Sequence, residues 1–162
     1  FLADGNVDTR HALALLGEWM LVLKDDLAAI ENLTRAVGVP DAPPSLYPRL
    51  IGLLVRTGRT TDARAQLLKF ADVPNVSTEL RRTRARLLKD QGLAEAAIKD
   101  LRVLAADKEP ADELTLASAL LDEHNAQEAK PILDSLLSRP DLTRTAFVVA
   151  LQLLVEAGEP AS

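Results

Sequence analysis

The sequence has no cysteine, few aromatic residues and no long hydrophobic run. Without cysteine there is neither a disulfide framework nor a thiolate metal site, and the redox compartment is not encoded. Aromatic residues make up 3% of the 162 residues, so the core must consist mainly of aliphatic and small side chains, as stacked helices allow. The most hydrophobic stretch, residues 19–23, is much shorter than the roughly 18 to 20 residues of a membrane span. We therefore expect a helical chain with no membrane span in this segment.

The chain also lacks the basic excess that a general nucleic-acid binder needs. Its formal net charge is −5, whereas neutralising phosphates requires a basic surface. Hydrophobic residues make up 48% of the chain, enough for a continuous core. No basic-then-apolar signal segment is present, so we expect any targeting sequence to lie outside these residues. The sequence predicts a folded chain with no nucleic-acid partner.

Motifs for catalysis are missing as well. There is no glycine-rich phosphate loop, no Gly-x-Ser-x-Gly turn and no His-Glu-x-x-His metal motif. The two histidines, His11 and His124, lie far apart in the chain and are not expected to share a metal or a proton. We expect no enzyme activity, no cofactor, and no catalytic or metal-binding residues.

What the sequence does contain is an internal repeat. Gly58, Gly92, His124 and Gly158 follow one another at nearly equal intervals of about 34 residues. An alanine follows the first three of these positions after five residues, and Ala29 lies at the matching place one repeat earlier. These alanines are Ala29, Ala63, Ala97 and Ala129. The spacing indicates one supersecondary unit repeated along the chain.

Apolar residues continue the repeat with helical spacing. Four residues after each alanine comes a leucine, and three residues later another apolar residue. The two series are Leu33, Leu67, Leu101 and Leu133, and Ala36, Phe70, Leu104 and Leu136. Prolines close the units at Pro40, Pro74, Pro110 and Pro140. Glycine at the repeated turn suits the left-handed backbone that ends a helix, so each unit is predicted to be two antiparallel helices joined by a tight turn.

In this order of small and large residues the chain resembles the tetratricopeptide repeat, a helical hairpin of about 34 residues. The matching positions, taken unit by unit, include Leu16, Gly17, Ala29, Ile30, Tyr47, Leu50, Gly58, Ala63, Ala85, Leu88, Gly92, Ala97, Leu116, Ala117, Leu120, Ala129 and Leu133. Some positions depart from the pattern: Ile51 and Leu151 replace a small residue, His124 replaces the turn glycine, and Arg81 and Arg84 stand where apolar residues are usual.

The resemblance implies an all-α fold, an α-solenoid of stacked antiparallel helical hairpins that forms a right-handed superhelix. We expect a single solenoid over residues 1–162, with partial units at both ends. The expected units span residues 10–43, 44–77, 78–109 and 110–143, with a partial unit over 144–158.

Basic residues concentrate in the first helix of the third unit. In the register of the resemblance, first helices line a concave groove, and Arg82, Arg86 and Lys89 face it from one side of their helix. Guanidinium groups hold carboxylates in paired hydrogen bonds, so these three residues are candidates to bind an acidic ligand. The alternative is a solvated helix face balanced by nearby acidic residues, namely Glu79, Asp90 or Glu95.

Other units add candidates for the same groove. They are Glu18 in the first unit, Gly52 and Arg56 in the second, Ser118 in the fourth and Gln152 in the fifth. The regular lysine and asparagine clamp of the chaperone-binding members is missing, which argues against a chaperone adaptor. The lone tryptophan, Trp19, is expected to pack against a neighbouring helix.

The predicted function is a protein-interaction scaffold. The repeats look like those of bacterial envelope proteins that export exopolysaccharides such as Pel polysaccharide or cellulose, which implies a periplasmic setting and a polysaccharide-modifying enzyme as partner. Two alternatives stay open: a cytoplasmic assembly or regulatory adaptor for an acidic peptide, and direct binding of a charged polysaccharide. Apolar residues near the C-terminal end, Phe147, Val148 and Leu151, are expected to be exposed and able to mediate self-association.

Overall fold

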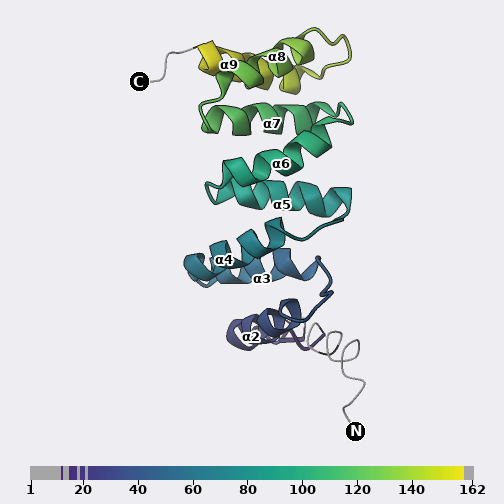
Figure 1. Cartoon of the computed structure of the whole chain (residues 1–162). Coiled ribbons are helices and arrows are strands. Elements are labelled where there is room, and N and C mark those ends of the chain that lie inside the picture. Colours follow the sequence, from purple (N-terminus) through teal and green to yellow (C-terminus); the bar gives the residue numbers. More distant parts are fainter. Residues whose placement is uncertain (1–11, 13–14, 18, 21, 159–162) are drawn as a thin grey trace. The chain divides into compact units, whose positions relative to one another are not determined.

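The computed structural model describes residue 12 and residues 15–17, 19–20 and 22–158. Throughout this part of the chain the regular elements are helices, and no strand occurs. The helices with complete bounds are α2 (Asp26–Val37), α3 (Leu46–Arg56), α4 (Thr60–Ala71), α5 (Thr78–Asp90), α6 (Ala94–Ala105), α7 (Pro110–Asp122), α8 (Ala126–Leu137) and α9 (Arg144–Gly158) (Figure 1). The predicted all-α fold of helical hairpins is confirmed.

The helices belong to two compact units. Unit 1 comprises Phe1–Val76 and unit 2 comprises Ser77–Ser162. In unit 1, α3 packs against α2 and against α4. In unit 2, each helix from α5 to α8 packs against the next, and α9 packs against both α7 and α8. Within each unit, helices that are neighbours in sequence are thus neighbours in space, as in an array of hairpins.

Left-handed backbone marks the turn inside each hairpin. Gly58 and Gly92 have φ of 75° and 66°, as predicted for turn glycines. His124 has φ of 57° at the third such position, so it does take the place of a turn glycine. Lys24, with φ of 60°, lies one repeat before Gly58 and fills the same role in front of α2, which sequence reasoning missed.

A second series of left-handed residues lies in the connections that follow second helices. Asp41, Asn75 and Lys108 have φ of 59°, 52° and 61°. Each stands about one repeat after the previous one, so the repeat extends to these connections as well. Asparagine and aspartate tolerate this conformation better than most residues with a Cβ, and lysine does so less readily.

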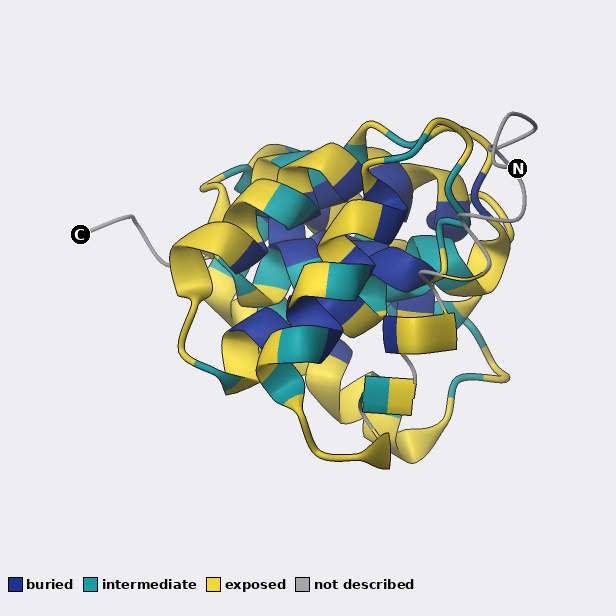
Figure 2. Ribbon diagram, turned by 90° about the horizontal axis from the view of Figure 1, so that it is seen from below, coloured by how far each residue is buried: buried dark blue, intermediate teal, exposed yellow. Residues whose placement is uncertain are grey.

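The repeated alanines and leucines form the core. Ala29, Ala63, Ala97 and Ala129 have 0% exposed area, and the leucine series is at most 2% exposed. In α4, α6 and α8 buried residues lie along one side and exposed residues along the other, whereas α7 has exposed residues only near its two ends. Figure 2 shows the buried and exposed residues along the helices. Gly17 is buried against Leu33: a Cβ at Gly17 would lie 2.7 Å from Leu33 Cγ, which explains the need for glycine there.

Arginine at the two unusual positions is paired inside the α5–α6 hairpin. Arg84 is 4% exposed, and its Nε and Nη2 donate to the two carboxylate oxygens of Asp100 at 2.6 and 2.7 Å. Arg81 Nη1 donates to the same carboxylate at 3.1 Å. The departure from the repeat pattern is therefore a buried ionic cluster that joins the first helix of this hairpin to the second.

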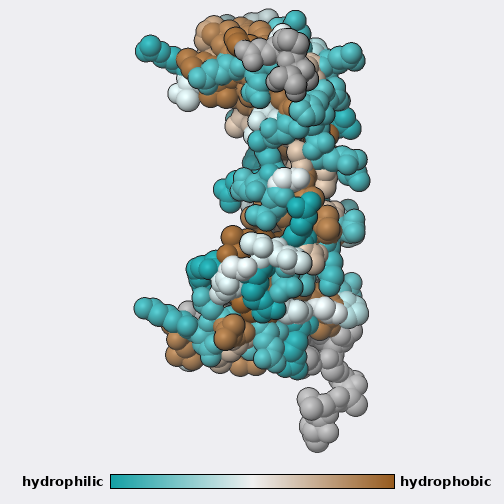
Figure 3. Space-filling view, turned by 90° about the vertical axis from the view of Figure 1, so that its left-hand side faces the viewer, coloured by the Kyte–Doolittle hydropathy of each residue, from teal (hydrophilic) through white to brown (hydrophobic). Residues whose placement is uncertain are grey.

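Exposed apolar side chains occur where α9 ends unit 2. Phe147, Val148 and Leu151 are 41%, 47% and 41% exposed, as predicted, and hydrophobic atoms gather at this end of the unit (Figure 3). Self-association through them stays a prediction. The prediction for Trp19 was wrong: its side chain is 65% exposed, so it does not fill a gap between helices.

Candidate functional site

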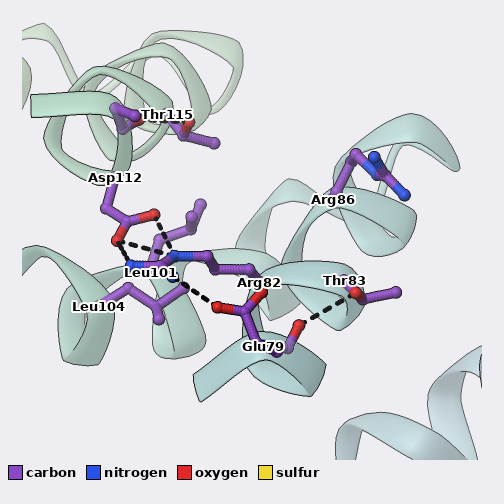
Figure 4. A pocket seen from close by; sticks show the side chains of 9 residues that line it. Glu79, Arg82, Thr83, Arg86, Leu101, Leu104, Asp112 and Thr115 are labelled. Carbon is purple, nitrogen blue, oxygen red and sulfur yellow. Dashed lines mark hydrogen bonds and ion pairs between the residues drawn. The ribbon is translucent and has the colours of Figure 1, made fainter. Parts of the chain in front are cut away.

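A first pocket in unit 2 is lined by residues of α5, α6 and α7. It has a volume of about 310 Å³, and its polar lining comes from α5 and α7. The polar lining residues are Glu79, Arg82, Thr83, Arg86, Asp112 and Thr115, and Leu101 and Leu104 of α6 contribute apolar surface (Figure 4).

Arg82 is held by two carboxylates. Its Nε lies 3.1 and 3.2 Å from the oxygens of the buried Asp112, its Nη2 donates to Asp112 at 2.9 Å, and its Nη1 donates to Glu79 at 3.0 Å (Figure 4). The hydrogen bonds and the charge of Asp112 raise the pKa of Arg82 above its usual value. Removing Arg82 would leave the carboxylate of Asp112 buried without its partner. Arg82 therefore joins α5 to α7 and is not free to bind a ligand.

Lys89 is also engaged, one helical turn beyond Arg86. Its Nζ lies 2.9 Å from Asp122 Oδ2, and its side chain is only 29% exposed. Asp122 is the last residue of α7, so this ion pair makes a second tie between α5 and α7. The sequence suggested Glu79, Asp90 or Glu95 as the residues that balance these cations. Of these three, Glu79 pairs with Arg82. The other partners of Arg82 and Lys89 are Asp112 and Asp122, which the sequence did not suggest.

Arg86 is the third of the three basic residues predicted to line the groove from α5. It is exposed, it lines the pocket, and within the described part of the chain its guanidinium has no hydrogen bond or ion pair. Figure 4 shows its side chain pointing away from the Arg82–Asp112 pair. A guanidinium offers five donors in a planar fork, so Arg86 can receive a carboxylate without breaking a contact of the fold.

A second pocket adjoins the first and is more apolar. It has a volume of about 260 Å³ and is lined by Leu114 and Ser118 of α7, Val149 and Leu153 of α9, Lys89 of α5, and Thr115, which also lines the first pocket. The two pockets therefore lie next to each other on one surface of unit 2, which we call the α5–α7–α9 face.

Four of the eight predicted groove residues line these pockets: Arg82, Arg86, Lys89 and Ser118. Gly52 lies on α3 in unit 1 and lines neither. Gln152 is exposed on α9 and lines neither pocket. Arg56 belongs to unit 1, where its guanidinium forms an ion pair with Asp26. Glu18 lies outside the described residues.

Sequence reasoning missed Asp112, Thr115, Leu114, Val149 and Leu153. Asp112 gave no distinct signal in the sequence. An acidic residue in the first turn of a helix is usually explained by its favourable interaction with the helix dipole. The register of the repeat did contain the signal for Leu114 and Val149, since both lie on first helices near the predicted groove residue Ser118 or Gln152.

Metal sites and membrane spans are absent from the described residues. No group of His, Cys, Asp or Glu among them is arranged to hold a metal ion. None of the described helices is both long and apolar enough to cross a membrane.

Comparison with solved structures identifies the fold. The crystal structure of a tetratricopeptide repeat protein from Parabacteroides merdae ATCC 43184 superposes with a TM-score of 0.65 and 18% identity, covering 93% of this chain and 61% of that one. Residues 41 to the end of MamA from Desulfovibrio magneticus RS-1 give a TM-score of 0.56 and 11% identity, with 93% of each chain covered. The chain has the tetratricopeptide-repeat fold. No family model and no curated protein sequence matches it.

At these identities the likeness concerns the fold alone. The chain spans about 61% of the length of the Parabacteroides protein. The tetratricopeptide resemblance predicted from the sequence is confirmed at the level of architecture, and the role of the chain has to be argued from its own surface.

Proposed function

We propose that the chain is a non-catalytic scaffold that binds an acidic segment of a partner protein on the α5–α7–α9 face. The observation that carries the proposal is the environment of Arg86, an exposed guanidinium at a pocket whose neighbouring cations, Arg82 and Lys89, are already paired. These two residues hold α5 to α7 through Asp112 and Asp122, so the surface is pre-formed. A pre-formed surface binds with less loss of conformational freedom.

The chemistry of the pockets favours a protein partner over a sugar. Among the described residues, no aromatic side chain lines either pocket, whereas sugar sites commonly use aromatic rings as platforms. Direct binding of a charged polysaccharide is therefore the weaker candidate. For a cationic polymer the net charge of −5 would still give long-range attraction.

The setting of the scaffold is a proposal based on sequence resemblance. We propose that it belongs to a bacterial exopolysaccharide-export assembly in the periplasm and recruits a polysaccharide-modifying enzyme, with a cytoplasmic adaptor as the alternative. The repeat units in this proposal remain residues 10–43, 44–77, 78–109, 110–143 and the partial 144–158.

A capture experiment with one charge reversal tests the function. The chain, its Arg86→Glu variant and a Lys130→Glu variant are immobilised separately and exposed to envelope and cytoplasmic extracts of the native host. Lys130 is the matched control, because it is exposed on α8, outside both pockets, and undergoes the same change of charge. Arg82 and Lys89 are left intact, since their loss would disturb the α5–α7 contact.

We expect a partner that is retained by the chain and by Lys130→Glu but lost with Arg86→Glu. The extract that supplies it, and its identity by mass spectrometry, then distinguish the envelope setting from the cytoplasmic one. Equal retention by all three proteins would show that the α5–α7–α9 face is not the binding surface.

A further inference from the structure

The two adjoining pockets on the α5–α7–α9 face differ in chemistry. The first carries the exposed guanidinium of Arg86, and the second is walled mainly by aliphatic side chains. Thr115 lines both, so one continuous ligand can reach from one to the other without leaving the surface. We infer that the ligand is an extended peptide segment that sets a carboxylate against Arg86 and an aliphatic side chain in the second pocket. This inference rests on the proposed function.

The carboxylate is expected at the Arg86 end of the first pocket rather than at its centre. At the other end Glu79 and Asp112 surround Arg82, and their negative charges would repel a second anion. Arg86 lies seven residues beyond Glu79 on α5, and Lys89 follows it after three residues on the same side of the helix. The positive side of the site therefore faces the second pocket.

The second pocket suits one aliphatic side chain. Leu114, Val149 and Leu153 supply its apolar walls, while Ser118 and Thr115 supply hydroxyl groups. Lys89 lines it too, but Asp122 balances its charge at 2.9 Å. A charged or strongly polar ligand side chain would lose hydration there without gaining an ionic partner, so leucine, isoleucine, valine or methionine is favoured.

The arrangement also predicts the spacing of the two ligand residues. In an extended chain, side chains two or four residues apart point to the same side, and those three apart point to opposite sides. Each residue advances about 3.3 Å, so separations of two and four span about 7 and 13 Å. Thr115 lines both pockets, so the two subsites lie on either side of one residue, and both separations can bridge them.

Amide chemical shifts of the ¹⁵N-labelled full chain, titrated with synthetic peptides, test this ligand. The probes are acetylated, amidated eleven-residue Gly/Ser peptides that carry one Glu and one Leu at separations of two, three and four residues. Two further peptides at the best separation replace Glu by Gln or Leu by Ser. All changes except one are made in the ligand, so the folding of the chain is unaffected; the exception is the exposed Arg86→Gln.

We expect shifts at Arg86, Thr115 and Ser118, and tighter binding at separations of two or four than of three. Loss of the charge-assisted hydrogen bond in the Gln peptide, or of the buried leucine in the Ser peptide, is expected to weaken binding about tenfold in each case. In the Arg86→Gln chain the Glu and Gln peptides should bind alike.

The outcomes separate this inference from the proposed function. If the Ser peptide bound as well as the Leu peptide while the preference for Glu persisted, the aliphatic subsite would be refuted and the acidic-ligand scaffold would stand. Equal binding at all three separations would refute the extended conformation. If Glu and Gln peptides bound alike to the unaltered chain, or no peptide shifted residues of this face, the proposed function itself would be contradicted.

Discussion

The hairpins α3–α4 and α5–α6 place different chemistry at the same repeat positions. One repeat onward along the chain, Tyr47 corresponds to Arg81, Leu50 to Arg84, and Gln66 to Asp100. All three changes bring charge into the second of the two hairpins. They occur together, because a buried charge is tolerated only with a partner that balances it.

In α3–α4 the contact between the two helices is apolar. Tyr47 stacks on Phe70 with ring centroids 5.1 Å apart and planes 4° from parallel, and Leu50 is fully buried. Among the described residues, no group satisfies the buried Oε1 of Gln66. In α5–α6 the matching carboxylate of Asp100 accepts hydrogen bonds from Arg84 and Arg81. The repeat thus fixes the backbone of a hairpin and leaves the chemistry that joins its helices open.

The largest effect is expected from Leu50→Arg, which puts the α5–α6 arginine into the apolar hairpin. A buried guanidinium without a carboxylate partner should lower the free energy of unfolding by about 4 kcal/mol. The measurement is urea denaturation followed by circular dichroism. Adding Gln66→Asp supplies the matching carboxylate, so the double variant should recover at least about 2 kcal/mol. Independent, additive effects of the two changes would show that the positions are not equivalent.

Arg84→Leu makes the reverse exchange in unit 2, with a somewhat smaller effect because Arg81 still pairs with Asp100. We expect a loss of about 3 kcal/mol in the free energy of unfolding. Replacing Asp100 by Leu as well removes the buried carboxylate that has lost one of its two arginine partners. Stability should then return to within about 1 kcal/mol of the original, provided Arg81 turns toward solvent. A double variant less stable than Arg84→Leu alone would mean that the ionic cluster cannot be replaced by apolar packing.

The turns should respond alike in both hairpins, whatever joins the helices. Gly58→Ala and Gly92→Ala place a Cβ on left-handed backbone, so each should lower the free energy of unfolding by about 1 kcal/mol. His124→Gly removes such a Cβ and should raise the thermal midpoint slightly. Thermal unfolding of the three variants measures this. Clearly unequal losses at Gly58 and Gly92 would break the equivalence of the two backbones.

The smallest effect concerns pH and applies only to the apolar hairpin. Burial raises the pKa of Tyr47 above its ordinary value of 10.0. A phenol whose pKa is higher in the folded state stabilises that state fully below pH 10, and this contribution is lost as the pH rises through the folded pKa. Because Tyr47 is the single tyrosine, its tyrosinate absorbance gives the titration directly. Tyr47→Phe should remove this part of the alkaline loss of stability, and a native midpoint at or below 10 would contradict the burial of the hydroxyl.

The helical hairpins could be predicted from the sequence because their signals are local and repeated. The alanine and leucine series gave the core, and Gly58, Gly92 and His124 gave the turns. The ionic cluster was visible only as two misplaced arginines, since its third member, Asp100, lies on another helix and has no distinguishing local pattern. Lys24 was not recognised as a left-handed turn residue, because lysine, unlike glycine, does not indicate that conformation in a sequence.

The candidate site was predicted in part. Helical spacing correctly put Arg82, Arg86 and Lys89 along one side of α5, but periodicity within one helix says nothing about the acidic residues of the next. Asp112 and Asp122 come from α7 and engage two of the three cations. Only packing between helices could single out Arg86.

The most direct test of the role of Arg86 is a charge-reversal cycle. Binding of the Glu/Leu peptide and of a Lys/Leu peptide of the same spacing is measured for the chain, for Arg86→Glu and for Lys130→Glu. The chain and Lys130→Glu should prefer the Glu peptide, whereas Arg86→Glu should prefer the Lys peptide, because the charge that meets the ligand has been inverted. If Arg86→Glu kept the preference of the original chain, Arg86 would not be the residue that receives the ligand's charge, and the proposed site would be wrong.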